Sequence, residues 1–439
     1  MPLIGRIKEV NRYLLYPLFT VLLLYTLIHF SYSGIYFPLV HGEKIGQIEE
    51  ELVPLARFLK GGEFVFNNPR QYGPFFILAI TPLMVFHNNG FNFATALLIV
   101  SYMLITLSFC ICYRHIFQFR DKTEKTLTFW ICLFLWLNFS PLLYIITVRN
   151  VEVWELFLIC LGFLAYIKRR YFITGFSFAA ATLTKMLPGI YIFYYFFKHK
   201  KTFFYSLLGL GIITALAHVI FGPSIGSGYI PFLLTRPFGS RTWAVTFFEN
   251  TSLKGFIYKL FGGFKTDSFG YNFLISPEAE KAAFIAITVL QAVILFYLAR
   301  MALKKDGSKE GLIIQLSLVS IAMVILSPIS AFEYGTLLLF AYSAGIYFIL
   351  YREIPKYMYA IYGISYLLVG NFFPVSMFAR IFPLKTLNSL LGNTRFDLAE
   401  SYKAYCIPLV GFLLLAVFFV LLLRNKKTAA PEKQRQEII

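Results

Sequence analysis

The stretch RNVEVWELFLICLGFLAYIKRRYFITGFSFAAATLTKMLPG, residues 149–189, decides what kind of protein this is. A polar cluster opens an apolar run that ends in a basic triplet, and a second apolar run stops at Lys185, three residues before Pro188. A lone lysine between two short apolar runs lies deep in a membrane protein, where its charge costs ~2.5–3.5 kcal/mol unless it is solvated or paired. The sequence therefore predicts that an anionic group meets Lys185.

The composition of the whole chain supports a membrane protein. Hydrophobic residues make up 58% of the 439 residues and charged residues 14%, in repeated apolar runs long enough to cross a ~30 Å hydrocarbon core. The first apolar run, 13–32, lacks a small-residue cleavage site, so we expect it to remain as a span. The formal net charge of +18 reflects topology rather than nucleic-acid binding, because the basic residues fall between apolar runs.

The cysteines and histidines predict neither a disulfide framework nor a metal site. All five cysteines fall within the predicted spans, where free thiols behave as small hydrophobic groups. The six histidines are scattered and form no HExxH pair, and no glycine-rich nucleotide signature is present. We therefore expect no metal and no other cofactor.

Basic residues orient the predicted spans. Arg6, Lys8 and Arg12 place the N-terminus in the cytoplasm. The apolar piece 72–86 contains two prolines and is short for a span, which predicts a re-entrant or interfacial helix. If this piece crossed the membrane, the basic cluster at 114–125 would lie outside, against the positive-inside rule.

The same rule predicts an all-α polytopic membrane protein with about twelve crossings and both termini in the cytoplasm. The spans are expected at 13–32, 91–113, 127–147, 151–167, 171–184, 186–197, 203–221, 281–301, 311–331, 335–351, 357–375 and 404–424. Residues 1–424 would form a single membrane domain, followed by a disordered basic tail at 425–439. Two long external segments are expected at 34–90 and 222–280, and a shorter one at 376–403.

The first external segment contains three consecutive carboxylates, Glu49, Glu50 and Glu51. Consecutive side chains point in different directions on a helix, so at most one or two of them face a shared pocket. One interpretation is a solvated acidic helix start. The other is a general base that takes the proton from an acceptor hydroxyl, for which Glu49 and Glu50 are candidates.

Cationic groups for an anionic substrate are expected at three positions. The Lys185 ammonium is a compact charge suited to a phosphate or pyrophosphate, although a lysine that snorkels to the membrane interface is the alternative. Arg236 and Arg241, in the second external segment, are candidates for a bidentate anion clamp.

A helix break supplies a further acid. In LSPISAFEYG, residues 326–335, Pro328 interrupts the helix and frees backbone groups that need partners. Glu333 follows this break, and a carboxylate at such a depth indicates function unless the membrane interface solvates it. The sequon beginning at Asn250 is a glycosylation acceptor only in a host that glycosylates such sites.

Taken in order, these segments resemble the polyprenol-phosphate-sugar-dependent glycosyltransferases of the C-type fold, and most closely glycosyltransferase family 87. The resemblance is carried by LARFLKGGEFVF with QYGPFFILAITPL, by AAATLTKMLPGIYIFYYFFKHKK, by ENTSLKGFIYKL and by LSPISAFEYG. It implies transfer of a sugar such as mannose from a polyprenyl-phosphate donor to a lipid or glycan acceptor, by direct inverting displacement. It also implies an active site on the external face of a bacterial inner membrane.

The resemblance assigns residues, with departures from the family pattern. The family's acid in the first external loop is usually Asp, and counting back from Ala56 places Glu49 there. An acid and histidines normally follow the last motif, whereas Glu333 and Tyr334 stand in this region here, so Glu333 is a candidate replacement base. The residues expected to line the substrate are Tyr72, Arg149, Asn150, Asn250, Ser252 and Tyr334.

Two other functions use similar chemistry. A flippase or other transporter of a lipid-linked saccharide also needs a deep lysine, although it needs no acid in a long external loop. A polymerase or ligase that joins a glycan to a lipid shares the donor. Convergence of Glu49 and Lys185 on one cavity would favour the transferase.

Overall fold

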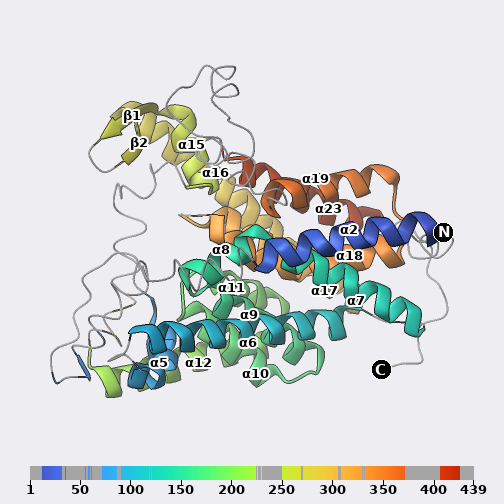
Figure 1. Ribbon diagram of the computed structural model, residues 1–439. Coiled ribbons are helices and arrows are strands. Elements are labelled where there is room, and N and C mark those ends of the chain that lie inside the picture. The colour runs from blue at the N-terminus through green and yellow to red at the C-terminus, as the bar shows by residue number, and fades with distance from the viewer. Residues whose placement is uncertain are drawn as a thin grey trace.

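The computed structural model describes nine stretches of the chain and a few single positions between them. The stretches are 12–31, 72–86, 90–117, 121–223, 250–267, 270–304, 308–328, 332–370 and 406–425, and the single positions are 35, 55, 58, 59, 61, 119, 225, 229 and 330. These residues are almost entirely helical, as the apolar runs predict. Figure 1 shows the helices packed into one bundle.

The helices follow the predicted order along the chain. They are α2 (Arg12–Phe30), α5 (Pro74–Ile80), α6 (Gly90–Ile116), α7 (Lys122–Leu137), α8 (Ser140–Val148), α9 (Glu152–Ile167), α10 (Tyr171–Thr182), α11 (Gly189–Lys198), α12 (Lys200–Phe221), α15 (Leu253–Phe261), α16 (Pro277–Ala302), α17 (Lys309–Leu326), α18 (Leu339–Tyr351), α19 (Lys356–Gly370) and α23 (Ile407–Asn425). Two 3-10 helices, η2 (Thr81–Phe86) and η3 (Phe332–Leu338), continue α5 and precede α18.

Fewer membrane spans than the predicted twelve meet the criteria of helix length and hydropathy. Among the described residues, six helices are long and apolar enough to cross a membrane, or seven if α7 and α8 form one bent span. The remaining predicted spans are helical but do not meet these criteria over their described residues, so a count of about twelve is not confirmed. Helix α5 with η2 is also too short to qualify, as is α10, so the non-spanning character expected for 72–86 stays a prediction.

One β-hairpin departs from the all-α prediction. Strands β1 (Gly263–Asp267) and β2 (Gly270–Leu274) pair antiparallel, with Gly263 opposite Leu274 and Asp267 opposite Gly270. The hairpin lies at the edge of the bundle beside α15 (Figure 1). Alternating Phe, Tyr and Thr residues favour strands, and this short pattern lies within the long external segment expected at 222–280.

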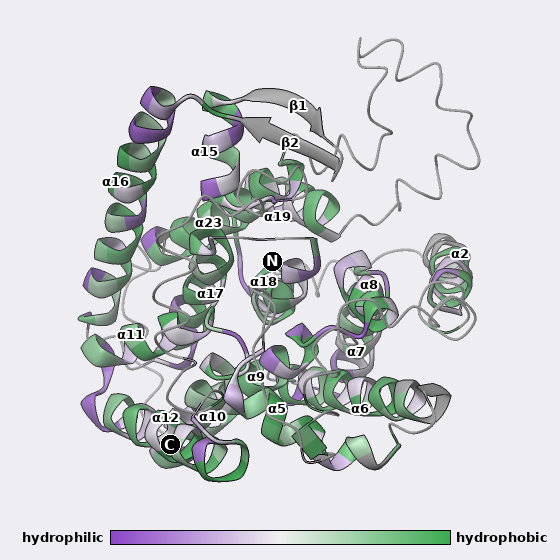
Figure 2. Ribbon diagram, turned by 90° about the vertical axis from the view of Figure 1, so that its left-hand side faces the viewer, coloured by the Kyte–Doolittle hydropathy of each residue, from purple (hydrophilic) through white to green (hydrophobic). Residues whose placement is uncertain are grey.

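The bundle has a buried centre and an apolar outer surface. In the candidate span formed by η3 and α18, residues 332–351, 94% is buried inside the bundle. In the candidate span of α16, only 17% is buried. Figure 2 shows α16 and α12 on the outside, mainly hydrophobic, with α17 and α18 nearer the middle. A helix that is apolar and exposed on its outer face suits a lipid environment.

Helix breaks place polar groups between the apolar helices. Helices α7 and α8 meet at an angle of 54°, where Pro141 is the second residue of α8 and the Asn138 amide donates to Thr26 Oγ1 at 2.8 Å. Helix α8 ends at Arg149, whose φ of 53° is left-handed. The polar cluster predicted at 149–150 is therefore the turn between α8 and α9.

The second break, between α10 and α11, is held from outside by the segment that leads into α5. Gly73 N donates to Thr184 O at 2.8 Å, and Phe75 N donates to Leu183 O at 3.0 Å. The two backbones approach so closely that a Cβ on Gly73 would lie 2.1 Å from Leu183 O. Only glycine fits there, and the contact brings the start of α5 beside Lys185.

Candidate active site

The centre of the site is an ion pair between Lys185 and Glu152. Lys185 lies in the break between α10 and α11, and its Nζ is 2.6 Å from Glu152 Oε1 at the first turn of α9. The Glu152 side chain is fully buried, whereas the Lys185 side chain is 23% exposed. An anionic group does meet Lys185, as predicted, but in this structure it is a carboxylate of the protein itself.

An aromatic ring completes the setting of the lysine. Lys185 Nζ lies over the ring of Tyr334, 4.3 Å from its centroid. Tyr334 is buried in η3, and its ring adds a cation–π attraction that holds the ammonium in place. An ammonium has three N–H donors, and Glu152 uses one of them, so Lys185 retains hydrogen-bonding capacity for a second anion.

A second carboxylate lies three residues further along α9. Glu155 is fully buried, and neither of its carboxylate oxygens has a hydrogen-bond partner among the described residues. Residues three apart on a helix share a face, and the charges of Lys185 and Glu152 both act on Glu155. A lysine and two buried carboxylates therefore form one cluster.

Tyr72 and Asn150 connect this cluster to the start of α5. Tyr72 Oη donates to Asn150 Oδ1 at 2.6 Å, and the same oxygen accepts from Val151 N at 2.8 Å. The Asn150 amide therefore fixes both the turn into α9 and the position of Tyr72. The charge of Lys185 also acts on Tyr72, which places the tyrosine at the cluster.

Arg149 and Glu333 are both buried near these residues in the chain. Arg149 is 6% exposed and stands next to Asn150, at the left-handed end of α8. Glu333 is 9% exposed, precedes Tyr334 in η3 and acts on it electrostatically. The structure thus brings together five predicted residues, which are Tyr72, Asn150, Lys185, Glu333 and Tyr334.

Asn250 and Ser252 form a different structure, a clasp between two of the predicted motifs. Asn250 Oδ1 accepts from Ser252 N at 3.1 Å and from Ser330 N at 3.0 Å, and its Nδ2 donates to Pro328 O at 3.2 Å. The Thr251 hydroxyl donates to Ser330 O at 2.8 Å. These bonds satisfy the backbone groups freed by the helix break at Pro328.

The clasp also determines what Asn250 is able to do. Its side chain is 1% exposed and its amide nitrogen is hydrogen-bonded, so the folded protein does not offer this sequon to a glycosylating enzyme. Ser252 accepts from Gly255 N at 2.9 Å and caps α15. Lys259, on α15, donates to Asn250 O at 2.8 Å and adds a further hydrogen bond to the clasp.

The remaining predicted residues lie outside the described part of the chain. They are Glu49, Glu50, Arg236 and Arg241. Among the described residues, no group of three or more His, Cys, Asp or Glu side chains is arranged to hold a metal. Glu152 and Glu155 are site residues that were not predicted from the sequence. Two acids spaced i, i+3 at the start of an apolar run were the available signal.

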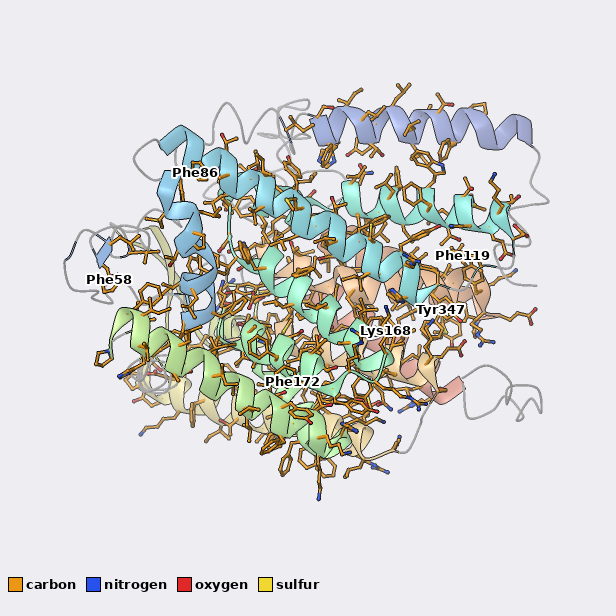
Figure 3. All side chains as sticks on the ribbon, turned by 90° about the horizontal axis from the view of Figure 1, so that it is seen from below. Phe58, Phe86, Phe119, Lys168, Phe172 and Tyr347 are labelled. Atoms are coloured by element: carbon orange, nitrogen blue, oxygen red, sulfur yellow. The ribbon has the colours of Figure 1, made fainter. Side chains whose placement is uncertain are left out.

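The position of the cluster within the bundle follows from α9. With 16 residues this helix is about 24 Å long, so Glu152 and Lys168 lie far apart. Figure 3 shows Lys168 and Tyr347 toward the end of the molecule opposite to Phe58 and Phe86. We call the end with Lys168 the basic end and the end with Phe86 the α5 end. The cluster lies at the start of α9, which is the end of this helix nearer to the α5 end.

The comparison with known protein families matches the part of the chain that contains this cluster. The model of glycosyltransferase family 87 matches residues 71–328, which is more than half of the 439 residues. The matched range includes Glu152, Glu155 and Lys185 as well as the Asn250 side of the clasp. No curated protein matches the chain.

Proposed function

Because this chain belongs to glycosyltransferase family 87, we propose that it transfers a hexose, such as mannose, from a polyprenyl-phosphate donor to a lipid or glycan acceptor. The observation that supports this most directly is Lys185, a partly exposed ammonium held between Glu152 and Tyr334. Its remaining N–H donors match the oxygens of a phosphodiester. The polyprenyl tail would extend along the apolar outer surface of the bundle.

The reaction is a direct displacement at the anomeric carbon. The acceptor hydroxyl attacks from the face opposite the phosphate and forms a new C–O bond. The proton of this hydroxyl passes to a carboxylate. The bond from the sugar to the phosphate oxygen breaks at the same time, and its electron pair leaves with polyprenyl phosphate. The configuration inverts, and Lys185 stabilises the negative charge that grows on the leaving phosphate.

The base is expected to be Glu49, on the resemblance of the first external segment, with Glu50 beside it. Glu333 is the second candidate, and its burial beside Tyr334 favours it because Tyr334 contacts Lys185. Arg236 and Arg241 remain candidates for further contacts with the donor phosphate. No step of this reaction requires a metal or another cofactor.

The proposed orientation follows from the charges at the basic end. Lys168, Arg169 and Arg170 lie in the turn between α9 and α10, and Lys198, Lys200 and Lys201 lie around the turn between α11 and α12. The positive-inside rule assigns such clusters to the cytoplasm. The cluster around Lys185 would then face the periplasmic side of a bacterial inner membrane.

The test is an assay of purified protein with radiolabelled polyprenyl-phosphate mannose and extracted membrane lipids. Transfer of label to lipid or glycan by the wild type, and its loss in a Glu152→Leu/Lys185→Met double variant, would support the proposal. Lys201→Ala is the control, because Lys201 is exposed at the basic end. If the protein moves the labelled lipid across vesicle membranes without transferring the sugar, the transferase proposal is wrong and the flippase function is favoured.

A further inference from the structure

Glu155 is the group in this cluster that the proposed reaction does not use. Its side chain is fully buried, and within the described part of the chain both carboxylate oxygens lack hydrogen-bond partners. Burial of an ionised carboxylate without a partner costs far more free energy than burial of the neutral acid, unless a cation compensates the charge. The nearby cation is Lys185, and it already lies 2.6 Å from Glu152.

Among the groups that the structure describes, the charges around Lys185 balance if one carboxyl is neutral. The titratable groups that act on this lysine are Glu152 and Glu155 from α9, Tyr334 from η3 and Tyr72 from the segment before α5. Glu333 acts on Tyr334 from the neighbouring position. One ammonium offsets one carboxylate, and Glu152 is the carboxylate in contact with it, so Glu155 carries a proton.

Binding of a phosphodiester changes this balance. The donor phosphate would share the Lys185 ammonium with Glu152 and so weaken the hydrogen bond between Lys185 Nζ and Glu152 Oε1. The other oxygen, Glu152 Oε2, has no partner among the residues that the structure describes. The site therefore needs a second hydrogen-bond donor for Glu152 when the donor substrate is present.

We propose that Glu155 is a neutral carboxylic acid that donates its proton in a hydrogen bond to Glu152 when the donor phosphate engages Lys185. Residues at i and i+3 on a helix have Cβ atoms about 5–6 Å apart, which two glutamate side chains span easily. A hydrogen bond from an acid to a carboxylate is short and strong. Glu155 is then a positioning residue, and no proton leaves the pair.

This arrangement rests on the proposed function and extends it to the chemistry of the donor. With Glu155 neutral, the cluster of Lys185, Glu152 and Glu155 has no net charge before binding. A singly charged phosphodiester then brings the cluster to a single negative charge, spread over the phosphate and the hydrogen-bonded carboxyl pair. If Glu155 were ionised, the donor would meet a cluster that is already negative.

Infrared difference spectroscopy on protein with isotope-labelled glutamate tests the protonation state directly. The wild type should show the carbonyl band of a protonated carboxylic acid without donor, and this band should shift when polyprenyl-phosphate mannose is added. The band should be missing in Glu155→Gln and present in Glu278→Gln, because Glu278 is exposed at the start of α16. A wild type without the band, or a band that Glu155→Gln retains, overturns the proposal.

Equilibrium binding of the labelled donor tests the role. Glu155→Gln keeps a hydrogen-bond donor and should bind within a few-fold of the wild type, whereas Glu155→Ala should bind roughly tenfold or more weakly. Equal binding by Glu155→Ala and wild type overturns the positioning role. If the wild type shows the acid band but binds no polyprenyl-phosphate sugar, the proposed function fails while the neutral state of Glu155 stands.

Discussion

Lys185, in the break after α10, and Glu152, in the first turn of α9, meet with 2.6 Å between Nζ and Oε1. The contact makes each residue depend on the other, because removal of one partner leaves the other charge buried and uncompensated. Any substitution of Lys185 therefore tests two things at once, the binding of a donor phosphate and the stability of the fold. The two effects can be separated by changing both residues.

We expect Lys185→Ala alone to destabilise the protein by about 3–5 kcal/mol, because Glu152 would remain buried without its partner. The double variant Glu152→Leu/Lys185→Met replaces the pair by apolar side chains of similar size and should unfold close to the wild-type temperature. Its donor affinity should nevertheless fall roughly 10- to 150-fold, which is the loss of one charge-assisted contact. Thermal unfolding in detergent and donor binding are the two measurements. A stable double variant with wild-type donor affinity would remove Lys185 from the site.

The sequence predicts the helices and the order of the motifs well, because apolar runs and prolines act locally. It also predicts an anion at Lys185, since a buried ammonium requires one. It does not predict which anion, because Glu152 lies 33 residues earlier and the pairing depends on how α9 packs against the break after α10. The role expected for Asn250 illustrates the same limit, since one of its partners, Ser330, is 80 residues away in the chain.

Gly73 allows a second prediction, on the contact that brings Tyr72 to the site. A Cβ at this position would lie 2.1 Å from Leu183 O, so Gly73→Ala forces the segment before α5 away from the break. We expect a loss of stability of about 1–3 kcal/mol and weaker donor binding. Gly211→Ala is the matched control, because nothing lies within 4 Å of a Cβ there. Equal unfolding temperatures for the two variants would contradict the close approach of the two backbones.

The clasp between the motifs around Asn250 and Ser330 provides a third prediction. Asn250→Ala removes the acceptor for two backbone N–H groups and should cost about 1–3 kcal/mol of stability. Asn250→Asp retains the Oδ1 acceptor and should cost less than the alanine variant. The free energy of unfolding of the three proteins is the measurement. If the alanine variant is as stable as the wild type, the two motifs are held together by other contacts.

The same clasp predicts the fate of the sequon. Expression in a host that glycosylates Asn-x-Ser/Thr sites should leave the folded protein without a glycan at Asn250, because the side chain is buried and hydrogen-bonded. Mass spectrometry of the peptide containing Asn250 provides the measurement. Full occupancy of this site would show that the segment is open when the enzyme of the host reaches it.

The last prediction concerns the base, for which two carboxylates compete. Glu49→Gln keeps the size and hydrogen bonding of the side chain but cannot accept the proton from the acceptor hydroxyl. We therefore expect turnover to fall by ~10²–10⁴ while donor binding survives. Glu333→Gln is the matched comparison, because Glu333 is buried and directly precedes Tyr334, whose ring contacts Lys185. Loss of turnover in Glu333→Gln alone would transfer the role of the base to Glu333, on the same η3 helix that contacts Lys185. Full activity of both variants would be incompatible with a carboxylate base at either position.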